Sequence, residues 1–426
     1  MIQYRFLPER KTEGRLLSLV GLYLLIGGLV LFLTDKPAAE DNLPLLSILP
    51  VMLAFAAVSI YWRFTGYKGD QLLLPMVAFL SANGLIFLLR LDPAYALRQA
   101  AWLAIALVCL VLITGYCRNY LFLSDYQYIY VLAGVVLLIL PIFFGIEQGG
   151  AKSWLNFGLF QVQSSEFVKI LLVLFLTGYL TENRPVLAVG NMNLGFISIP
   201  EAKYWVPLIA MWAVSLLLLV FQKDLGTALI YFGTFLAMLY IATARLSYIF
   251  SGMALFLLGA GFSYQFFSHV RTRVLVWLNP WPYSDTSGYQ VIQSIVALAS
   301  GGITGNGFNA GFPKFIPAVH TDFIFSAIGE EMGFLGGAGI ILIYLLMVYR
   351  GLRITLSSRD DFSMLLAAGL TVLISFQAFI IIAGVTKLLP LTGVTLPFVS
   401  YGGSSLVANF VLLGLLLNVS NEAEQL

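Results

Sequence analysis

Long apolar runs alternate with short polar connections along almost the whole 426-residue chain. Each run is close to the length of about 18 or more residues that an α-helix needs to cross the hydrocarbon core of a bilayer. The pattern predicts an all-α, polytopic integral membrane protein with about twelve transmembrane helices. The predicted spans are residues 15–34, 44–62, 71–89, 98–116, 126–146, 166–182, 204–221, 223–243, 246–267, 322–349, 361–385 and 395–419.

Two connections are much longer than the others, at residues 147–165 and 268–321. Both mix Trp and Phe with Gly and a few charged residues, a composition typical of segments that lie in the membrane interface. Within the second connection, "QVIQSIVALAS" at 290–300 predicts a short helix that is partly in the membrane.

The Lys and Arg residues in the connections indicate the orientation, because basic residues are enriched on the cytoplasmic side. With the N-terminus inside, 13 of the 23 Lys and Arg residues lie on that side. This predicts that both chain ends are cytoplasmic and that both long connections are extracytoplasmic. The first apolar run has no small-residue cleavage site after it, so it is expected to remain as a helix.

Composition narrows the classes of function. The chain is 60% hydrophobic and 10% charged, against about 25% charged in soluble domains. A net charge of +2 argues against a nucleic-acid partner. Cys109 and Cys117 are about 12 Å apart on a helix and cannot form a disulfide with each other. Two histidines argue against a His-rich metal site, and no P-loop motif is present.

Three carboxylates occur in "FIPAVHTDFIFSAIGEEMGF", residues 315–334. A charge near the bilayer centre costs about 2.5–3.5 kcal/mol, so each one needs a structural or functional reason. On a helix, Glu330 lies about 80° and Glu331 about 180° around the axis from Asp322, so one face cannot carry all three. Asp322 or Thr321 can cap the helix, and the two glutamates can pair with cations inside the bundle.

A second charged motif is "QSSEFVKI", residues 163–170, at the start of a predicted span. Glu166 and Lys169 have the i,i+3 spacing of an ion pair on a helix. Ser164 or Ser165 can serve as the N-cap. The motif is therefore either a capped ion pair or part of a binding site.

Two further motifs carry charges beside apolar runs. "FQKDLGTA", residues 221–228, places Lys223 and Asp224 in a tight turn, for which a solvated hairpin is the alternative. Arg271 and Arg273 precede "VLVWLNPW". The planar fork of arginine suits a phosphate group, although an interfacial amphipathic helix explains the pattern equally well.

In the predicted topology, Lys152, Lys169, Arg271 and Arg273 lie on the same side of the membrane as Asp322. Cations beside a carboxylate at an outer cavity fit a lipid substrate that carries phosphate. The broken segment "LPLTGVTLPFVSYGGSS", 389–405, is either the entry loop of a helix or backbone that lines a cavity.

Taken with their order, these motifs resemble the FtsW/RodA family, the shape, elongation, division and sporulation (SEDS) proteins of bacteria. The resemblance covers residues 65–420 and rests on five stretches: "QSSEFVKI", "QKDLGTA", "GYQVIQSIVALASGG", "HTDFIFSAIGEEMGFLGG" and "LPLTGVTLPFVSYGGSS". The family fold is a helical bundle, usually with ten core helices. This implies an N-terminal extension at 1–64 with two additional helices and a core at 65–420 that includes the extracytoplasmic loop 268–321.

The resemblance implies a peptidoglycan glycosyltransferase of the bacterial cytoplasmic membrane that polymerises glycan strands from lipid II, the undecaprenyl-pyrophosphate-linked disaccharide-pentapeptide. It also implies a class B penicillin-binding protein as partner, which cross-links the strands. The alternatives are a lipid II flippase, with a polar path open to both sides of the membrane, and a non-catalytic scaffold for the penicillin-binding protein. Elongation, division and sporulation members share the motifs, which therefore do not select one of these roles.

The family's essential aspartate falls on Asp322, either as the base that activates the acceptor hydroxyl or as a ligand of a divalent cation such as Mg²⁺ or Mn²⁺. No other cofactor is implied. The leaving pyrophosphate is a weak base, so one carboxylate is enough as general base. The residues expected to bind substrate are Arg273, Arg271, Lys169, Lys152, Glu166, Asp224, Arg98, His320, Ser400, Gly402, Gly403 and Ser404.

Four positions depart from the family pattern. Lys223 and Ser164 stand where proline is common, Ala318 where glutamate is common, and Lys387 where glycine is common. None of these departures removes Asp322.

Overall fold

The computed structural model describes residues 10–34, 47–148, 151–158, 160–189, 192–194, 197–199 and 202–423. Among these residues, eleven helices are long and apolar enough to cross a membrane, and a further apolar helix, α3, has 17 residues. The predicted all-α polytopic fold with about twelve spans is confirmed. The α-helices are α1 (Lys11–Thr34), α3 (Ile48–Phe64), α4 (Leu73–Leu91), α5 (Pro93–Tyr116), α6 (Gln127–Phe144), α7 (Ser164–Val189), α8 (Ala202–Phe221), α9 (Leu225–Thr243), α10 (Leu246–Phe266), α11 (Ser268–Leu278), α12 (Tyr289–Gly301), α13 (Ile324–Ser357), α14 (Asp361–Val385) and α15 (Gly403–Ala423).

The last predicted span begins later than expected, at Gly403 and not at residue 395. Residues 395–402 are not helical because Pro397 lacks a backbone donor and disfavours helical geometry in the residue before it. Phe398 adds a left-handed φ of 66°.

The short helix predicted at 290–300 is α12, and the basic segment before "VLVWLNPW" is the first part of the helix α11. Three short 3₁₀ helices lie at η1 (Tyr120–Tyr126), η2 (Trp281–Tyr283) and η3 (Pro313–Phe315).

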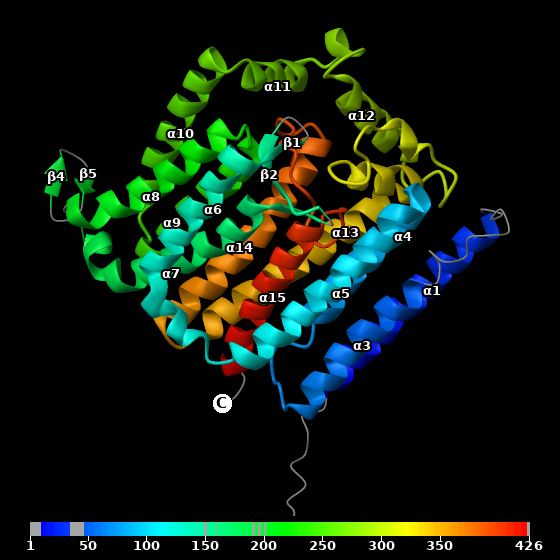
Figure 1. Cartoon of the computed structure of the whole chain (residues 1–426), viewed down its shortest axis with the longest axis horizontal. Helices are drawn as coiled ribbons and strands as arrows, with labels where there is room; N and C mark the ends of the chain where they lie inside the picture. The colour runs from blue at the N-terminus through cyan, green and yellow to red at the C-terminus, as the bar shows by residue number, and fades with distance from the viewer. Residues whose placement is uncertain are drawn as a thin grey trace, which may run out of the picture. The chain divides into compact units, whose positions relative to one another are not determined.

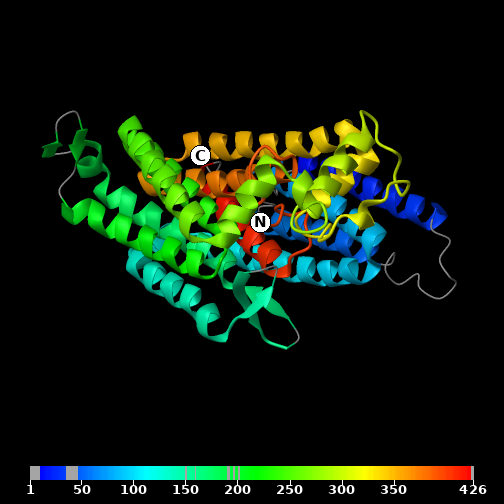
Figure 2. The ribbon, with the colours of Figure 1, turned by 90° about the horizontal axis from the view of Figure 1, so that it is seen from above.

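The connection at 147–165 contains a small antiparallel sheet, which the sequence did not predict. Its strands are β1 (Ile146–Gln148), β2 (Ala151–Asn156) and β3 (Gln161–Gln163), in the order β1-β2-β3. Leu155 pairs with Val162 and Asn156 with Gln161. The sheet projects from the end of α6 (Figure 2). A second hairpin joins β4 (Met192–Leu194) to β5 (Ile197–Ile199).

The chain forms two compact units, each built from separate stretches of sequence. Unit 1 contains residues 1–120, 296–358 and 395–426, and unit 2 contains residues 121–295 and 359–394. In unit 1, α1 packs against α3 and α4, α5 packs against α4 and α15, and α13 packs against α4 and α15 (Figure 1). In unit 2, α7 packs against α6, α9 and α14. The most deeply buried helices are α4 and α15 in unit 1 and α7, α9 and α14 in unit 2.

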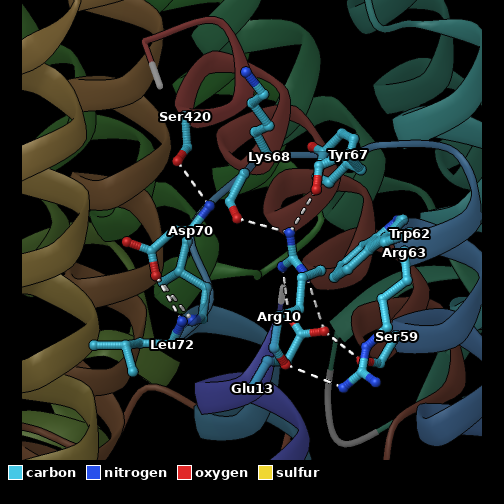
Figure 3. A network of polar contacts seen from close by, with 12 residues as sticks. Arg10, Glu13, Ser59, Trp62, Arg63, Tyr67, Lys68, Asp70, Leu72 and Ser420 are labelled. Carbon is cyan, nitrogen blue, oxygen red and sulfur yellow. Dashed lines mark hydrogen bonds and ion pairs between the residues drawn. The ribbon is translucent and has the colours of Figure 1, made fainter. Parts of the chain in front are cut away.

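A buried polar network joins the first helix to the rest of unit 1 (Figure 3). Arg10, whose side chain is 1% exposed, pairs with Glu13 and donates to the carbonyl oxygens of Tyr67 and Gly69, each at 2.9 Å. The Ser59 hydroxyl of α3 donates to Glu13 Oε1 at 2.5 Å. These contacts satisfy both buried charges, which explains how the ion pair is tolerated away from water.

The segment that follows Tyr67 continues this network to the end of α15. The Tyr67 hydroxyl donates to Asn418 Oδ1 at 3.0 Å, and the Asp70 N–H donates to Ser420 Oγ at 2.9 Å. The Asp70 carboxylate accepts from the N–H of Leu72 at 2.8 Å, at the start of α4. The two N-terminal helices are thus bonded to unit 1 through hydrogen bonds as well as apolar packing.

Candidate active site

In unit 1, Asp322 lies directly before α13, and Phe323 occupies the N-cap position. The backbone on its N-terminal side is bonded to the segment before α15. The N–H of Tyr401 donates to the carbonyl oxygen of His320 at 2.9 Å. The Ser400 hydroxyl donates to the carbonyl oxygen of Thr321 at 2.5 Å. These two bonds hold the backbone directly before Asp322. Asp322 itself is half-buried, so it is partly accessible to solvent.

Helix α5 positions the segment that makes these bonds. Gln99 Nε2 donates to the carbonyl oxygen of Ser400 at 3.1 Å, and the N–H of Gly402 donates to Gln99 Oε1 at 3.3 Å. Gln99 is 4% exposed, so both bonds are shielded from water. Gly403 packs against Trp102 of α5, and a Cβ at this glycine would lie 2.2 Å from the indole ring. The structure thus brings α5, the residues before Asp322 and the residues before α15 into one cluster.

An aromatic stack lies on the same cluster. The His320 ring is stacked on Tyr95 with centroids 4.3 Å apart, and Tyr401 lies 4.7 Å from Tyr95. The Arg98 guanidinium is 6.0 Å from the Tyr95 ring. Burial lowers the pKa of His320, and the nearby Asp92 carboxylate raises it in part. His320 is therefore neutral at pH 7.

Two of the predicted binding residues in unit 1 are placed next to Asp322: His320 lies two residues before it, and Ser400 bonds to the carbonyl oxygen of Thr321. Ser400 and Ser404 are buried, and the Ser400 hydroxyl is engaged with backbone at Thr321 and Leu396. Its observed contacts are therefore those of a residue that holds the local backbone. Direct substrate contact by these serines and by Gly402 and Gly403 stays a prediction.

Glu331 of α13 forms an ion pair with Arg90 of α4. Glu331 Oε1 lies 3.2 Å from Arg90 Nε, and the Glu331 side chain is fully buried. The prediction that Glu330 and Glu331 both meet cations inside the bundle is confirmed for Glu331, whereas Glu330 Oε1 accepts from the backbone N–H of Phe312.

In unit 2, the ion pair expected in "QSSEFVKI" is present at the start of α7. Lys169 Nζ lies 2.6 Å from Glu166 Oε2 and donates to Gln377 Oε1 of α14 at 2.8 Å. The Lys169 side chain is 3% exposed. The cation is therefore already balanced by a carboxylate within its own helix.

Asp224 caps α9 and is not part of a solvated hairpin. Its carboxylate accepts from the N–H of Thr227 at 3.1 Å, from Gln163 Nε2 at 3.1 Å and from the Ser165 hydroxyl at 3.3 Å. Burial raises the pKa of Asp224 above its usual value, while the bonds from Thr227 lower it. These bonds connect the small sheet, the start of α7 and the turn before α9.

The other three basic residues that were predicted to bind substrate, Arg273, Arg271 and Lys152, are less buried than Lys169. Arg273 of α11 donates to the carbonyl oxygen of Thr392 at 3.3 Å, and Arg271 is exposed. Lys152 of β2 is exposed and donates to the carbonyl oxygen of Ile142 at 2.8 Å. Of the predicted phosphate-binding residues, Arg271 and Lys152 are therefore the most accessible to a ligand.

Three of the four departures from the family pattern, at Lys223, Ala318 and Lys387, have a left-handed φ. Lys387, where glycine is common, has φ 62°, a left-handed geometry that glycine adopts freely. Ala318 has φ 53°. Lys223, where proline is common, has φ 61°, which the proline ring does not permit. The turn before α9 therefore has a geometry of its own in this chain.

Asp322 is the residue predicted to hold a divalent cation. Among the residues that the structure describes, no group of three or more His, Cys, Asp or Glu side chains is placed to hold a metal ion. A cation on Asp322 would depend on phosphate oxygens of a substrate for further ligands, which is how Mg²⁺ is commonly held.

Two residues of this cluster were missed by the sequence reasoning. Gln99 and Tyr95 lie on either side of Arg98, at and just before a predicted span. A polar amide at the mouth of a membrane helix was the available signal, since such groups require a partner.

Comparison with known proteins shows the family to which the chain belongs. The chain belongs to the FtsW/RodA/SpoVE family of cell cycle proteins, whose family model matches residues 68–425. It is 41% identical over 371 residues to the peptidoglycan glycosyltransferase RodA of Mycobacterium leprae, covering 85% of this chain and 79% of that protein. It is 37% identical over 334 residues to a probable peptidoglycan glycosyltransferase FtsW of Geobacter metallireducens, covering 77% and 86%.

A solved structure shares the fold. It was described under the heading "structural coordination of polymerization and crosslinking by a peptidoglycan synthase complex". It matches with a TM-score of 0.70 and 29% sequence identity, over 84% of this chain and 99% of that one. The family and the polytopic helical fold inferred from the sequence are thereby confirmed.

Proposed function

We propose that this protein is a peptidoglycan glycosyltransferase that polymerises glycan strands from lipid II. The observation that carries the proposal is the placement of Asp322. It is half-buried at the start of α13, and hydrogen bonds at His320 and Thr321 hold the preceding backbone. The curated relatives named as peptidoglycan glycosyltransferases support the same reaction.

In the proposed reaction, a sugar hydroxyl of the acceptor attacks the anomeric carbon of the lipid-linked donor. Asp322 accepts the proton of that hydroxyl as the new glycosidic bond forms and the bond to pyrophosphate breaks. The undecaprenyl pyrophosphate leaves as an anion and needs no proton. In the alternative role, Asp322 would instead hold a divalent cation on the pyrophosphate, and the cation would supply electrostatic stabilisation.

The stacked rings of His320 and Tyr95 lie in the same cluster as the backbone before Asp322, and neither ring is charged at pH 7. His320, two residues before Asp322, therefore adds no positive charge to this part of the site.

Arg271, Arg273 and Lys152 are proposed to bind the anionic pyrophosphate, and all three lie in unit 2. Arg271 and Lys152 are exposed, and guanidinium groups bind phosphate oxygens in pairs. Arg273 is held by Thr392 on the surface of unit 2. Lys169 is a weaker candidate because Glu166 already neutralises it.

The protein is an integral membrane protein, and we propose that Asp322 faces the outside of the cytoplasmic membrane. The basic-residue bias supports this orientation. We further propose that a class B penicillin-binding protein binds the bundle, as the likeness to a peptidoglycan synthase complex suggests.

The direct test is to give the purified full chain lipid II, with and without the penicillin-binding protein, and to look for glycan strands. Strand formation that requires this chain supports the proposal. Transfer of lipid II across vesicle membranes without strand formation would identify a flippase. Strands formed only by the partner would identify a scaffold.

A further inference from the structure

Residues 302–323, here called the arm, connect α12 to α13 and carry Asp322. Two buried carboxylates of α13 point at the backbone of the arm. The N–H of Asn309 donates to Glu331 Oε2 at 3.1 Å, and the N–H of Phe312 donates to Glu330 Oε1 at 2.9 Å. Each glutamate therefore holds a different residue of the arm.

Arg90, in the last turn of α4, completes this group. Its guanidinium donates to the carbonyl oxygen of Gly311 at 3.0 Å and lies 3.2 Å from Glu331. Gly311 packs directly on the carboxylates, since a Cβ there would lie 2.9 Å from Glu331 Cγ. One arginine and two glutamates thus bond to the backbone of residues 309–312.

The backbone of α13 also bonds to the arm, next to a break in the helix at Gly333. Gly333 has φ 67° and ψ −167°, which interrupts the helix and suits glycine. The carbonyl oxygen of Glu330 accepts from the N–H of Asn306 at 3.0 Å, and that of Glu331 accepts from the N–H of Gly307 at 3.1 Å. The start of the arm is therefore bonded to α13 through backbone as well as side chains.

Stability alone is a weak reason to bury this group. A buried ion pair is often no more stable than well-packed apolar residues, and here a second carboxylate, Glu330, is buried next to the pair of Arg90 and Glu331. Its contacts instead define one register of the arm on α13. Residues 309–312 lie about ten positions before Asp322, on the same continuous segment.

We propose that Arg90, Glu330 and Glu331 are positioning residues for the polymerase reaction, because they hold the arm in the register that places Asp322. This rests on the proposed function. Without the group, the arm adopts the productive geometry less often, and a misplacement of about 1 Å can cost about 10²-fold in rate. The expected signature is a loss of kcat with a smaller change in KM.

The chain offers a matched control on the same two helices. Asp70, at the start of α4, pairs with Arg350 of α13, and its carboxylate is 1% exposed. Asp70 precedes α4, so its ion pair also joins this end of α4 to α13, but its contacts are to Arg350, Leu72 and Ser420 and not to the arm. Asp70→Ala therefore reproduces the loss of a buried ion pair without touching the arm.

The first measurement is lipid II polymerisation by full-length Glu331→Ala, Glu330→Ala and Asp70→Ala, at equal amounts of folded protein. We expect kcat to fall about 10- to 100-fold in the two glutamate variants, with KM within about threefold, and to stay near wild type in Asp70→Ala. Glu331→Gln should recover part of the loss, because its amide oxygen still accepts from Asn309. Arg90→Lys tests the same contacts if the alanine variants do not fold.

The second measurement does not depend on activity. Lys314 is exposed within the arm, so trypsin cleavage after it reports how often the arm opens. We expect cleavage of Glu331→Ala about tenfold or more faster than wild type, and of Asp70→Ala at the wild-type rate, below the unfolding temperature. Unchanged cleavage in the glutamate variants overturns the proposal, as does a kcat loss that Asp70→Ala shares. If the wild-type protein forms no glycan, the proposed function fails, while the cleavage result still decides whether this group holds the arm.

Discussion

The Ser400 hydroxyl donates to the carbonyl oxygen of Thr321, the residue directly before Asp322. The same oxygen of Ser400 accepts from the N–H of Leu396 at 2.9 Å. One buried side chain therefore ties the broken segment before α15 to the start of α13. This relationship gives the glycine- and proline-containing segment at 395–402 a specific task, which is to hold the backbone at the candidate base.

Ser400→Ala removes this tie without changing the charge. We expect polymerisation to fall about tenfold, because the backbone before Asp322 gains freedom and the carbonyl oxygen of Thr321 loses its donor. Ser420→Ala is the matched control, since Ser420 is a buried serine of α15 that bonds to Asp70 instead. Equal effects of the two substitutions on activity, once folded fractions are matched, would assign Ser400 a purely structural role.

The network around Arg10 predicts non-additive effects on stability. Arg10→Met leaves Glu13 buried without its cation, which should cost about 3–5 kcal/mol. The double variant Arg10→Met, Glu13→Leu should be more stable than either single variant, because no uncompensated charge remains. Unfolding of the four proteins in mixed micelles measures this cycle. Additive losses would mean that the two side chains do not depend on each other.

The proposed orientation can be checked by thiol labelling in whole cells, in a background without Cys109 and Cys117. Gln161 and Ser287 are exposed and lie in the two long connections, so cysteines there should react with an impermeant reagent. A cysteine at Ser357, exposed at the end of α13, should react only after lysis. The reverse pattern would place Asp322 on the cytoplasmic side.

Stability should decrease at mildly acidic pH. Burial lowers the pKa of both histidines, and for His269 the charges of Arg273 and Lys223 lower it further. The unfolded chain then binds more protons than the folded one, so the stabilisation present above about pH 6.5 is lost as pH falls through the folded pKa values. We expect a lower Tm at pH 5.5 than at pH 7.5. Replacing both histidines by Gln should reduce this difference, and an unchanged difference would exclude them as its source.

The membrane spans could be predicted from sequence because the length and apolarity of a run are local properties. The same holds for the ion pair of Glu166 and Lys169, which lie one turn apart on a single helix. The sheet at 146–163 was not predicted, because its strands are short and their pairing depends on residues that are not adjacent in the chain.

Contacts near Asp322 between residues far apart in the chain could be predicted only in part. The sequence indicated that Glu331 would meet a cation, and Arg90 is that cation. It did not indicate that the glutamates would also accept from the arm, because Asn309 and Phe312 lie about 20 positions away in the chain and meet the glutamates only in the fold. Ser400 was expected to bind substrate, yet its hydroxyl bonds to backbone brought together by folding.

The central claim is that the carboxylate of Asp322 carries the chemistry, and Asp322→Asn tests it most directly. The substitution keeps the size of the side chain and its ability to accept hydrogen bonds, so membrane insertion, Tm and partner binding should be near wild type. The base is lost, which should lower the rate of lipid II polymerisation by about 10²- to 10⁴-fold. Polymerisation by Asp322→Asn at more than about a tenth of the wild-type rate would contradict the account and require the base to be another residue.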